Sequence, residues 1–253
     1  MADLYPHQAL VLILGAIPAR WGSTRFPGKA LAEIAGVPLV GRVVQAALGA
    51  RTLDAVVVVT DHEGIALAAE AAGGRAVLIE REAASGTDRI AQLLAADRAC
   101  GEASIVVNVQ GDEPLLEPAA IDAAVEALER DPRADIATLA RPLRPDELLD
   151  DPDLVKVDVD ANGRALAFSR APIPGADTAL VHIGLYAYRR AAIDRFVAAA
   201  PTPREKAERL EQLRALDLGL AIAVVPFDSR AIGVDTPADV ARVEAALMNA
   251  SAR

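Results

Sequence analysis

The chain has 253 residues and a formal net charge of −10, and 53% of its residues are hydrophobic while only 3% are aromatic. This length suits one large α/β domain or two small ones, with a core made mainly of Ala, Val, Leu and Ile. The acidic balance argues against nucleic acid as a main partner, because binding to a phosphate backbone needs a basic surface.

Cysteine content and apolar runs indicate the compartment. The single cysteine, Cys100, excludes an internal disulfide framework and a Cys-rich metal site. The apolar run at 9–17 follows a segment with Asp3 and without Lys or Arg, whereas a signal peptide starts with positive charge. No apolar stretch approaches the roughly 20 residues needed to span a bilayer. We expect a cytoplasmic protein with no membrane partner.

Strand patterns and Ala-rich helix patterns alternate along most of the chain. In chain order we expect a strand at 9–17, a helix at 39–50, a strand at 55–60, a helix at 63–72, a strand at 75–80, a helix at 88–99, a strand at 104–110, a helix at 118–130, strands at 135–141, 154–160, 164–170 and 180–189, helices at 190–199 and 203–218, a strand at 220–227 and a helix at 237–249. This alternation predicts an α/β fold in which a mixed, mostly parallel sheet lies between helices.

The segment of about 135–189 departs from the alternation, because strands follow one another there. Asn162 and Gly163 are typical of a tight hairpin turn. We therefore expect a β-rich subdomain inserted into one domain that spans residues 1–253.

The stretch "IPARWGSTRFPGKA" at 17–30 follows the first expected strand and is basic in an acidic chain. It carries Arg20, Arg25 and Lys29 and no acidic residue. Backbone N–H groups of the turn at 22–24 could bind phosphate oxygens. The three cationic side chains could neutralise the charge of the phosphates. On composition alone, a solvated basic loop is an equal alternative.

This stretch matches neither of the two common phosphate-loop patterns. The Walker pattern needs four residues between its glycines and a Ser or Thr after the Lys. Here five residues separate Gly22 from Gly28, and Ala30 follows Lys29. The G-x-G-x-x-G dinucleotide pattern is also absent after the first strand. The hydroxyl that holds Mg²⁺ in a Walker loop is therefore missing.

Two aspartates could supply the missing metal ligands. Asp112, in "NVQGDEP", follows an apolar strand at the edge of the sheet where ligands collect. Asp235, in "GVDTPADV", precedes a helix that Thr236 and Pro237 are suited to start, which leaves Asp235 without a capping role. Carboxylate oxygens suit Mg²⁺, although ordinary turn chemistry is the alternative for each aspartate.

A series of sequence blocks resembles one enzyme family. The blocks, in the family's order, are "IPARWGSTRFPGKAL", "VTDHE", "SGTDR", "VNVQGDEP", "FSRAPIP", "HIGLYAYR", "TPREKAERLEQLR" and "GVDTPADV". Together they resemble the 3-deoxy-manno-octulosonate cytidylyltransferases, or CMP-Kdo synthetases, from about Ile13 to Val243. The resemblance implies a nucleotide-diphospho-sugar transferase fold. It also implies a cytoplasmic homodimer that uses Mg²⁺ to join CTP to Kdo, with release of pyrophosphate, for lipopolysaccharide synthesis.

The resemblance also implies roles for individual residues. It places Arg20, Ser23, Arg25 and Lys29 on the CTP phosphates, Ser85, Gly86 and Thr87 near the cytosine and ribose, Asp112 and Asp235 on magnesium, and Gln110, His182, Tyr186, Glu211 and Gln212 on the sugar. Arg170 is a further candidate for the sugar carboxylate, because Arg grips carboxylates with two hydrogen bonds. Lys29, Arg20, Asp112 and Asp235 would carry the catalysis.

Structural explanations compete with several of these roles. The turn at 85–87 also suits a helix N-cap, His182 and Tyr186 could be satisfied core residues, and Glu211 with Gln212 could form a solvated helix face.

The identity of the sugar and the type of enzyme leave alternatives. Only seven residues, 175–181, separate "RAPIP" from "HIGLYAYR", and many relatives have a longer segment there. Another acidic sugar, such as 8-amino-Kdo or a sialic-type acid, is therefore an alternative substrate. A glycosyltransferase would typically carry an Asp-x-Asp motif, which "GDE" at 111–113 does not match. A catalytically silent nucleotide-binding regulator is a third possibility.

Overall fold

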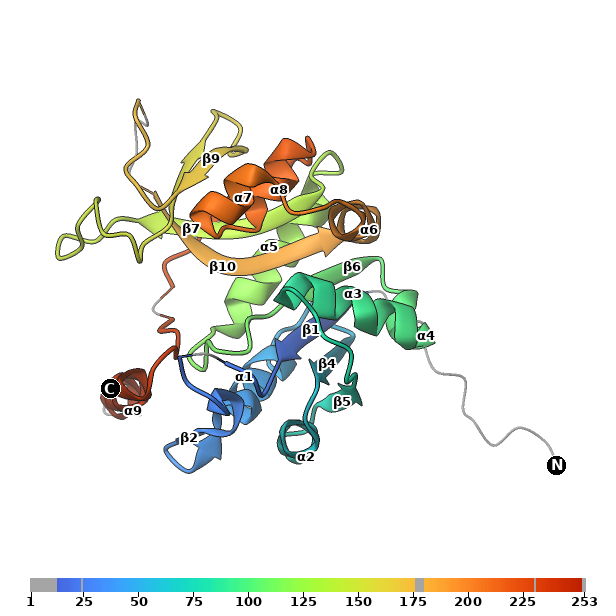
Figure 1. Ribbon diagram of the computed structural model, residues 1–253. Coiled ribbons are helices and arrows are strands. Elements are labelled where there is room, and N and C mark those ends of the chain that lie inside the picture. The colour runs from blue at the N-terminus through green and yellow to red at the C-terminus, as the bar shows by residue number, and fades with distance from the viewer. Residues whose placement is uncertain (1–12, 24, 176–179, 230, 252–253) are drawn as a thin grey trace.

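The computed structural model of the chain describes residues 13–23, 25–175, 180–229 and 231–251. In this part of the chain, nine strands form one mixed sheet, and helices cover both of its faces (Figure 1). The order along the sheet is β11-β7-β10-β6-β1-β4-β5, and β8 and β9 lie off this path. The expected α/β fold with a mixed, mostly parallel central sheet is confirmed.

The elements follow the expected alternation closely. The strands of the large sheet are β1 (Ile13–Ala19), β4 (Ala55–Thr60), β5 (Arg75–Leu78), β6 (Ile105–Asn108), β7 (Ile136–Pro142), β8 (Lys156–Val159), β9 (Ala165–Ser169), β10 (Leu180–Arg189) and β11 (Ile222–Pro226). The helices are α1 (Leu39–Leu48), α2 (Glu63–Ala71), α3 (Gly86–Ala96), α4 (Arg98–Gly101), α5 (Pro118–Arg130), α6 (Arg190–Ala198), α7 (Pro203–Glu208), α8 (Gln212–Asp217) and α9 (Pro237–Ser251). Residues 9–12 of the first expected strand lie outside the described residues.

The parallel half of the sheet decides where ligands can collect. β1 pairs in parallel with β4 on one side and with β6 on the other. All three strands therefore end at the same edge, where the chain continues into the basic loop after β1, into Asp61 after β4 and into residues 109–114 after β6. In an open α/β sheet this edge is the usual ligand site.

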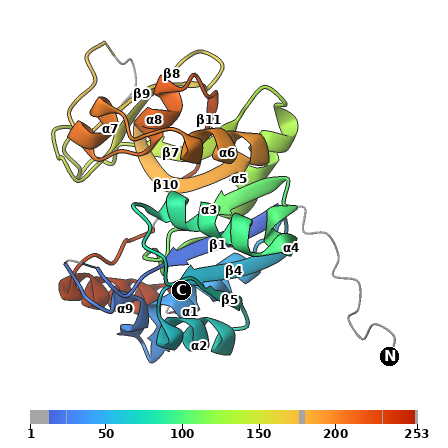
Figure 2. The same cartoon turned by 45° about the vertical axis from the view of Figure 1, so that its right-hand side comes forward.

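Two hydrophobic cores hold the helices on the sheet. One core packs α1, α2 and α5 against one face, with Val44, Ile65 and Ile121 fully buried. The other packs α3, α6 and α8 against the opposite face, with Ile90 and Phe196 fully buried. The strand runs are apolar on both faces because each face is covered by helices. Figure 2 shows α3 in front of β1.

The segment at 135–189 is divided between the main sheet and an extension of it. β7 and β10 lie inside the large sheet, where β10 is antiparallel to both β6 and β7. β8 and β9 form a hairpin that pairs with the start of β10. Its predicted turn is confirmed, since Gly163 has φ of 74° and its N–H donates to the carbonyl of Asp160 at 3.0 Å. Both views place this hairpin beside α7 and α8, at the end of the molecule away from α2 (Figures 1 and 2).

Two local expectations were wrong, and one small element was not expected. The single helix expected at 203–218 is two helices, α7 and α8, because Arg209 takes a left-handed conformation with φ of 56°. The helix expected at 88–99 starts at Gly86 and ends at Ala96, and the separate turn α4 follows. A small hairpin of β2 (Glu33–Ile34) and β3 (Val37–Pro38) was not expected, because two-residue strands leave no periodic signal.

The last helix, α9, docks on the N-terminal half of the chain. Val243 is fully buried in a small cluster with Ile34, Leu39 and Val234. The Glu244 carboxylate accepts the backbone N–H of Ala35 at 2.8 Å, and Figure 1 shows α9 beside β2. This docking brings the segment before α9 back to the ligand edge of the sheet. None of the helices in the described residues is long and apolar enough to cross a membrane.

Candidate active site

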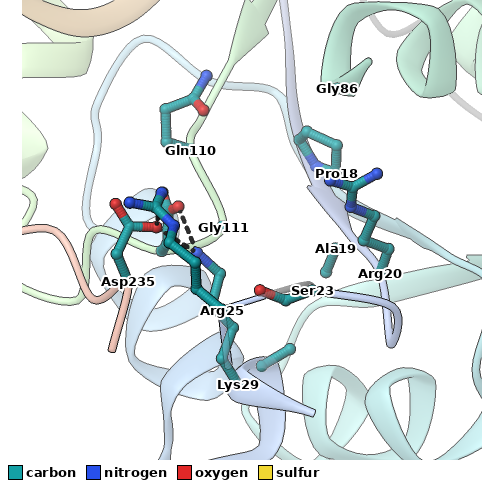
Figure 3. A pocket seen from close by; sticks show the side chains of 12 residues that line it. Pro18, Ala19, Arg20, Ser23, Arg25, Lys29, Gly86, Gln110, Gly111 and Asp235 are labelled. Atoms are coloured by element: carbon teal, nitrogen blue, oxygen red, sulfur yellow. Dashed lines mark hydrogen bonds and ion pairs between the residues drawn. The ribbon is translucent and has the colours of Figure 1, made fainter. Parts of the chain in front are cut away.

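A cationic cavity of about 260 Å³ opens where β1 and β6 end (Figure 3). Its wall includes all four predicted phosphate-binding residues and both predicted metal ligands: Arg20, Ser23, Arg25, Lys29, Asp112 and Asp235. The basic loop thus faces the strand-end aspartates across one cavity. Tertiary structure brings together groups that are more than 200 residues apart in the sequence.

Lys29 lies between the two aspartates. Its ammonium donates to Asp112 Oδ2 at 2.7 Å, to Asp235 Oδ1 at 3.2 Å and to the carbonyl of Val234 at 3.0 Å. Arg25 also reaches Asp235 Oδ1, at 2.8 Å, from a largely exposed position. Figure 3 shows these side chains converging from the loop and from the segment before α9. The two carboxylates therefore bind one cationic group between them, the Lys29 ammonium.

Backbone contacts set the two aspartates side by side. The Val234 N–H donates to the backbone carbonyl of Asp112 at 2.8 Å. The carboxylate of Asp239 accepts the N–H groups of Asp235 and Thr236 at 3.2 and 2.9 Å, and the Thr236 hydroxyl donates to it at 2.9 Å. Asp239 therefore holds the start of α9, and the side chain of Asp235 turns to Lys29 instead.

The expected backbone cradle at 22–24 is only partly available. The Ser23 N–H donates to the carbonyl of Trp21 at 2.9 Å, so it would have to leave this bond to reach a phosphate. The Ser23 side chain lines the cavity, and Thr24 lies outside the described residues. Phosphate binding by this loop would depend mainly on its cationic side chains.

A second cavity, of about 330 Å³, adjoins the first and shares Gly86, Gln110 and Asp112 with it. All six predicted sugar-binding residues line it: Gln110, Arg170, His182, Tyr186, Glu211 and Gln212. The break at Arg209 lets the start of α8 face this cavity, so Glu211 and Gln212 are not a solvated helix face. Gln212 is only 5% exposed.

The face of β10 that points into the second cavity carries His182, Gly184, Tyr186 and Tyr188. The imidazole Nε2 of His182 lies 2.9 Å from Thr138 Oγ1. Burial lowers the pKa of His182 to about 3 and raises that of Tyr186 well above its usual value. Both side chains are therefore neutral near pH 7, and they offer hydrogen bonds rather than charge.

Arg170 reaches the second cavity with part of its guanidinium already bonded. Its Nε donates to the carbonyl of Glu208 at 3.0 Å, and its Nη1 donates to that of Pro152 at 2.9 Å. These bonds fix the plane of the guanidinium. Among the residues that the structure describes, Nη2 of Arg170 has no hydrogen-bond partner and could contact a ligand.

A third cavity, of about 260 Å³, lies beside the start of α3 and shares Pro18, Ala19 and Arg20 with the cationic cavity. Ser85 and Gly86 line it, together with Arg89. Ser85 also caps α3, because its side chain accepts the Asp88 N–H at 3.2 Å. The cap and a place at a ligand cavity hold at once, as the sequence suggested. Thr87 instead lines the second cavity.

A chain of polar contacts joins the two ends of the site. Gln110 Nε2 donates to Asn108 Oδ1 at 3.2 Å, and Asn108 Nδ2 donates to Thr87 Oγ1 at 3.3 Å. Burial raises the pKa of Glu211, and the neighbouring Thr87 and Ser85 side chains oppose this rise. Glu211 Oε2 is buried and has no hydrogen-bond partner among the described residues. Glu211 lines both the second and the third cavity.

Four residues that were not predicted as site residues also line the second cavity: Asn108, Glu113, Tyr188 and Arg209. Burial, and then the charge of Asp112, raise the pKa of Glu113 to about 7. The position of Glu113 directly after Asp112 in "QGDEP" was the available signal. The left-handed Arg209 had none, because nothing in the helical pattern at 203–218 marks a break.

Comparison with known proteins decides the family. A protein-family model described as cytidylyltransferase matches residues 14–222. The 3-deoxy-manno-octulosonate cytidylyltransferase of Anaeromyxobacter dehalogenans (strain 2CP-1) is 49% identical over 91% of this chain and 96% of its own. The chain belongs to the 3-deoxy-manno-octulosonate cytidylyltransferase family.

Two further comparisons agree with this family. The 3-deoxy-manno-octulosonate cytidylyltransferase of Bdellovibrio bacteriovorus is 46% identical over 92% of this chain and 96% of its own. A solved CMP:2-keto-3-deoxy-manno-octonic acid synthetase in complex with CTP has a TM-score of 0.87 and 35% identity, with 94% of this chain and 99% of that one covered. The family resemblance and the nucleotidyltransferase class inferred from sequence are confirmed.

Proposed function

We propose that this cytidylyltransferase joins CTP to 3-deoxy-manno-octulosonate and gives CMP-Kdo and pyrophosphate. One observation carries the proposal: a cavity lined by Arg20, Arg25 and Lys29 meets a second, polar cavity at Gln110 and Asp112. The first suits a triphosphate, and the second suits a sugar rich in hydroxyls. The names of the relatives and the CTP in the solved neighbour support the same pair of substrates.

The reaction would be an in-line displacement at the α-phosphorus of CTP. A hydroxyl of the sugar attacks, the new oxygen–phosphorus bond forms, and the bond to pyrophosphate breaks. Negative charge develops on the leaving oxygens, so fixed cations are the groups that lower the barrier. Lys29 and Arg20 at the cationic cavity would take this role, and Arg25 and Ser23 would help to bind the triphosphate.

Asp112 and Asp235 fit a site for Mg²⁺. Both carboxylates already reach one cation, the Lys29 ammonium, and oxygen ligands suit Mg²⁺. No group of three or more His, Cys, Asp or Glu side chains with metal-site geometry occurs in the described residues. Phosphate oxygens and water would therefore complete the coordination. Bound Mg²⁺ would supply neutralisation of charge on the triphosphate and the reacting hydroxyl.

The nucleoside would occupy the third cavity, between the end of β1 and the start of α3. Ser85 and Gly86 line this cavity, which opens beside the triphosphate loop. Thr87 would act from the neighbouring wall, where it bonds Asn108. The base would thus lie next to the triphosphate, and the basic loop would keep the conformation that it has in this structure.

The sugar would be held by neutral donors together with the arginines that line the second cavity. Gln110, Gln212, His182 and Tyr186 offer hydrogen bonds to hydroxyl and carboxylate oxygens, Glu211 can accept from hydroxyls, and Arg170 adds positive charge. A hydroxyl that the sugar lacks would leave such groups unpaired, at a cost of about 1–3 kcal/mol each. Kdo should therefore be used far better than sialic acid.

The cellular part of the proposal follows from the family resemblance. We propose a cytoplasmic homodimer that supplies CMP-Kdo for lipopolysaccharide synthesis and that has neither nucleic acid nor membrane as a partner. Light scattering of the purified protein would measure the assembly: twice the 26.4 kDa chain mass is expected, and a monomer would refute the dimer.

Pyrophosphate release with CTP, measured with Kdo, 8-amino-Kdo and sialic acid in parallel, tests the reaction. We expect Kdo to give the highest kcat/KM. Faster turnover of 8-amino-Kdo or of sialic acid would show that the short segment 175–181 has changed the sugar specificity. Absence of pyrophosphate release with every sugar would favour the silent regulator.

A further inference from the structure

The basic loop is held by a contact that lies outside the three cavities. The dipeptide Asp61-His62, from the motif "VTDHE", follows β4 and faces Trp21, the single tryptophan of the chain. The Trp21 backbone N–H donates to Asp61 Oδ1 at 2.9 Å. The indole stacks on the imidazole of His62, with ring centroids 4.3 Å apart and planes 12° from parallel. None of these three residues lines a cavity described above.

Trp21 also closes the loop on itself. Its carbonyl accepts the N–H groups of Ser23 at 2.9 Å and of Gly28 at 3.0 Å. Gly28 has φ of 72°, and a Cβ there would lie 3.0 Å from Trp21 Cη2. The indole therefore lies between Gly28 and His62, and 44% of Trp21 remains exposed. The loop between Trp21 and Gly28 returns to its own start, and Lys29 leaves it at a defined point.

The second oxygen of Asp61 reaches the opposite wall of the third cavity. Asp61 Oδ2 accepts from Arg89 Nη2 at 3.1 Å, and Arg89 Nη1 donates to the carbonyl of Ile79 at 3.2 Å. The Arg89 side chain is only 5% exposed and lies on α3, whose start carries Ser85 and Gly86. Asp61 thus ties the end of β1 to the helix that faces it.

We propose that Trp21, Asp61 and His62 are positioning residues that hold loop 20–29 ready for a triphosphate. The inference rests on the proposed function, because it takes the cationic cavity as the CTP site. A loop with five or more free residues loses conformational entropy when a ligand orders it, whereas a loop already fixed on its scaffold does not. These three residues, which we call the clamp, should therefore affect the affinity for CTP. They should leave the affinity for the sugar unchanged, because none of them lines the second cavity.

Three substitutions separate the ring contact from other roles of these residues. Trp21→Ala removes the indole, and Trp21→Phe keeps an aromatic ring against His62. His62→Asn removes the imidazole but keeps an N-cap acceptor, which matters because His62 Nδ1 accepts the Gly64 N–H at the start of α2. Leu67→Ala is the matched control, since Leu67 is 66% exposed on α2 and outside the clamp.

Calorimetric titration with CTP and steady-state kinetics with both substrates test the clamp. We expect Trp21→Ala and His62→Asn to raise the Kd for CTP by about tenfold, with Trp21→Phe restoring most of the affinity. The KM for the sugar and the melting temperature should stay close to those of the Leu67→Ala control. Unchanged affinity for CTP in both variants, or equal losses for CTP, sugar and melting temperature, would overturn the inference.

Hydrogen exchange without nucleotide keeps this test separate from the proposed function. The amides of Ser23 and Gly28, which donate to Trp21, should exchange faster in Trp21→Ala than in the wild type. If the wild type failed to bind CTP, the proposed function would fall, and the exchange rates would still decide the clamp. Equal exchange in both proteins would show that the loop is fixed without the indole.

Discussion

The Lys29 ammonium lies 2.7 Å from Asp112 Oδ2 and so occupies a position between the carboxylates proposed for magnesium. Asp235 Oδ1 lies on the other side at 3.2 Å. The Lys29 ammonium thus pairs with both aspartates, and Arg25 also pairs with Asp235. A divalent cation and this ammonium would repel each other at the same position. If Asp112 and Asp235 hold Mg²⁺ as proposed, the Lys29 ammonium has to leave this position when the metal binds, and the oxygens of the triphosphate would attract it.

Lys29→Met should therefore have opposite effects on two ligands. Loss of the ammonium should strengthen Mn²⁺ binding to the nucleotide-free protein and weaken CTP binding by roughly tenfold to a hundredfold, because a hydrogen bond to a charged group contributes about 1.5–3 kcal/mol. Electron paramagnetic resonance measures free Mn²⁺, and calorimetry measures CTP binding. Lys206→Met, at an exposed position on α7, is the control. Unchanged Mn²⁺ affinity would contradict the competition.

Asp112→Asn should abolish most turnover in a folded protein. The substitution keeps the backbone carbonyl that accepts the Val234 N–H, so the neighbouring segments remain joined. It removes one of the two carboxylates proposed to bind Mg²⁺, and the loss of a group that stabilises transition-state charge typically costs about 10²–10³ in kcat. Pyrophosphate release at saturating Mg²⁺ is the measurement, with exposed Asp150→Asn as the control. Activity near that of the control would refute the metal assignment.

Gln212→Ala should act on the sugar alone. The side chain is buried at the wall of the second cavity and does not line the cationic one. Loss of a hydrogen bond to the sugar should raise its KM by about tenfold, while the Kd for CTP should stay within about twofold. Kinetics at varied sugar concentration and calorimetry with CTP separate the two effects. An equal change in both constants would assign Gln212 to the structure of the site as a whole.

His182 should make the protein less stable in mild acid. Burial lowers its pKa from 6.5 to about 3, so between these values the unfolded chain binds a proton that the folded protein does not. The free energy of unfolding should therefore fall as the pH drops from 6.5 towards 3, with a slope from this group of at most about 1.4 kcal/mol per pH unit.

His182→Gln keeps a polar group for Thr138 but does not titrate in this range. Denaturant unfolding at pH 7.5 and at pH 5.0 should show a smaller loss of stability on acidification in this variant than in the wild type. The other two histidines are present in both proteins, so their contributions cancel. An identical loss in the two proteins would show that the pKa of His182 is the same in the folded and in the unfolded state.

The alternation of strands and helices was predictable because it depends on local hydrophobic period. β4 (Ala55–Thr60), β10 (Leu180–Arg189) and α5 (Pro118–Arg130) match their expected bounds. The break at Arg209 was not predictable, because the sequence around it keeps a helical pattern and the left-handed residue is held by surrounding contacts. This break decides that Gln212 is buried at the second cavity.

The sequence by itself determined the fold class, the family and most of the residues that line the site. Strand and helix periods are local properties, and motif blocks such as "QGDEP" keep their order along the chain. Only the tertiary structure decided which groups meet: that Lys29 lies between Asp112 and Asp235, that Asp61 ties the basic loop to Arg89, and that Glu113 lines the second cavity. These contacts join residues 28 to 206 positions apart, or depend on how a turn aims one side chain. They follow from parallel strands that end at one edge and from α9 docking on β2, which no local pattern encodes.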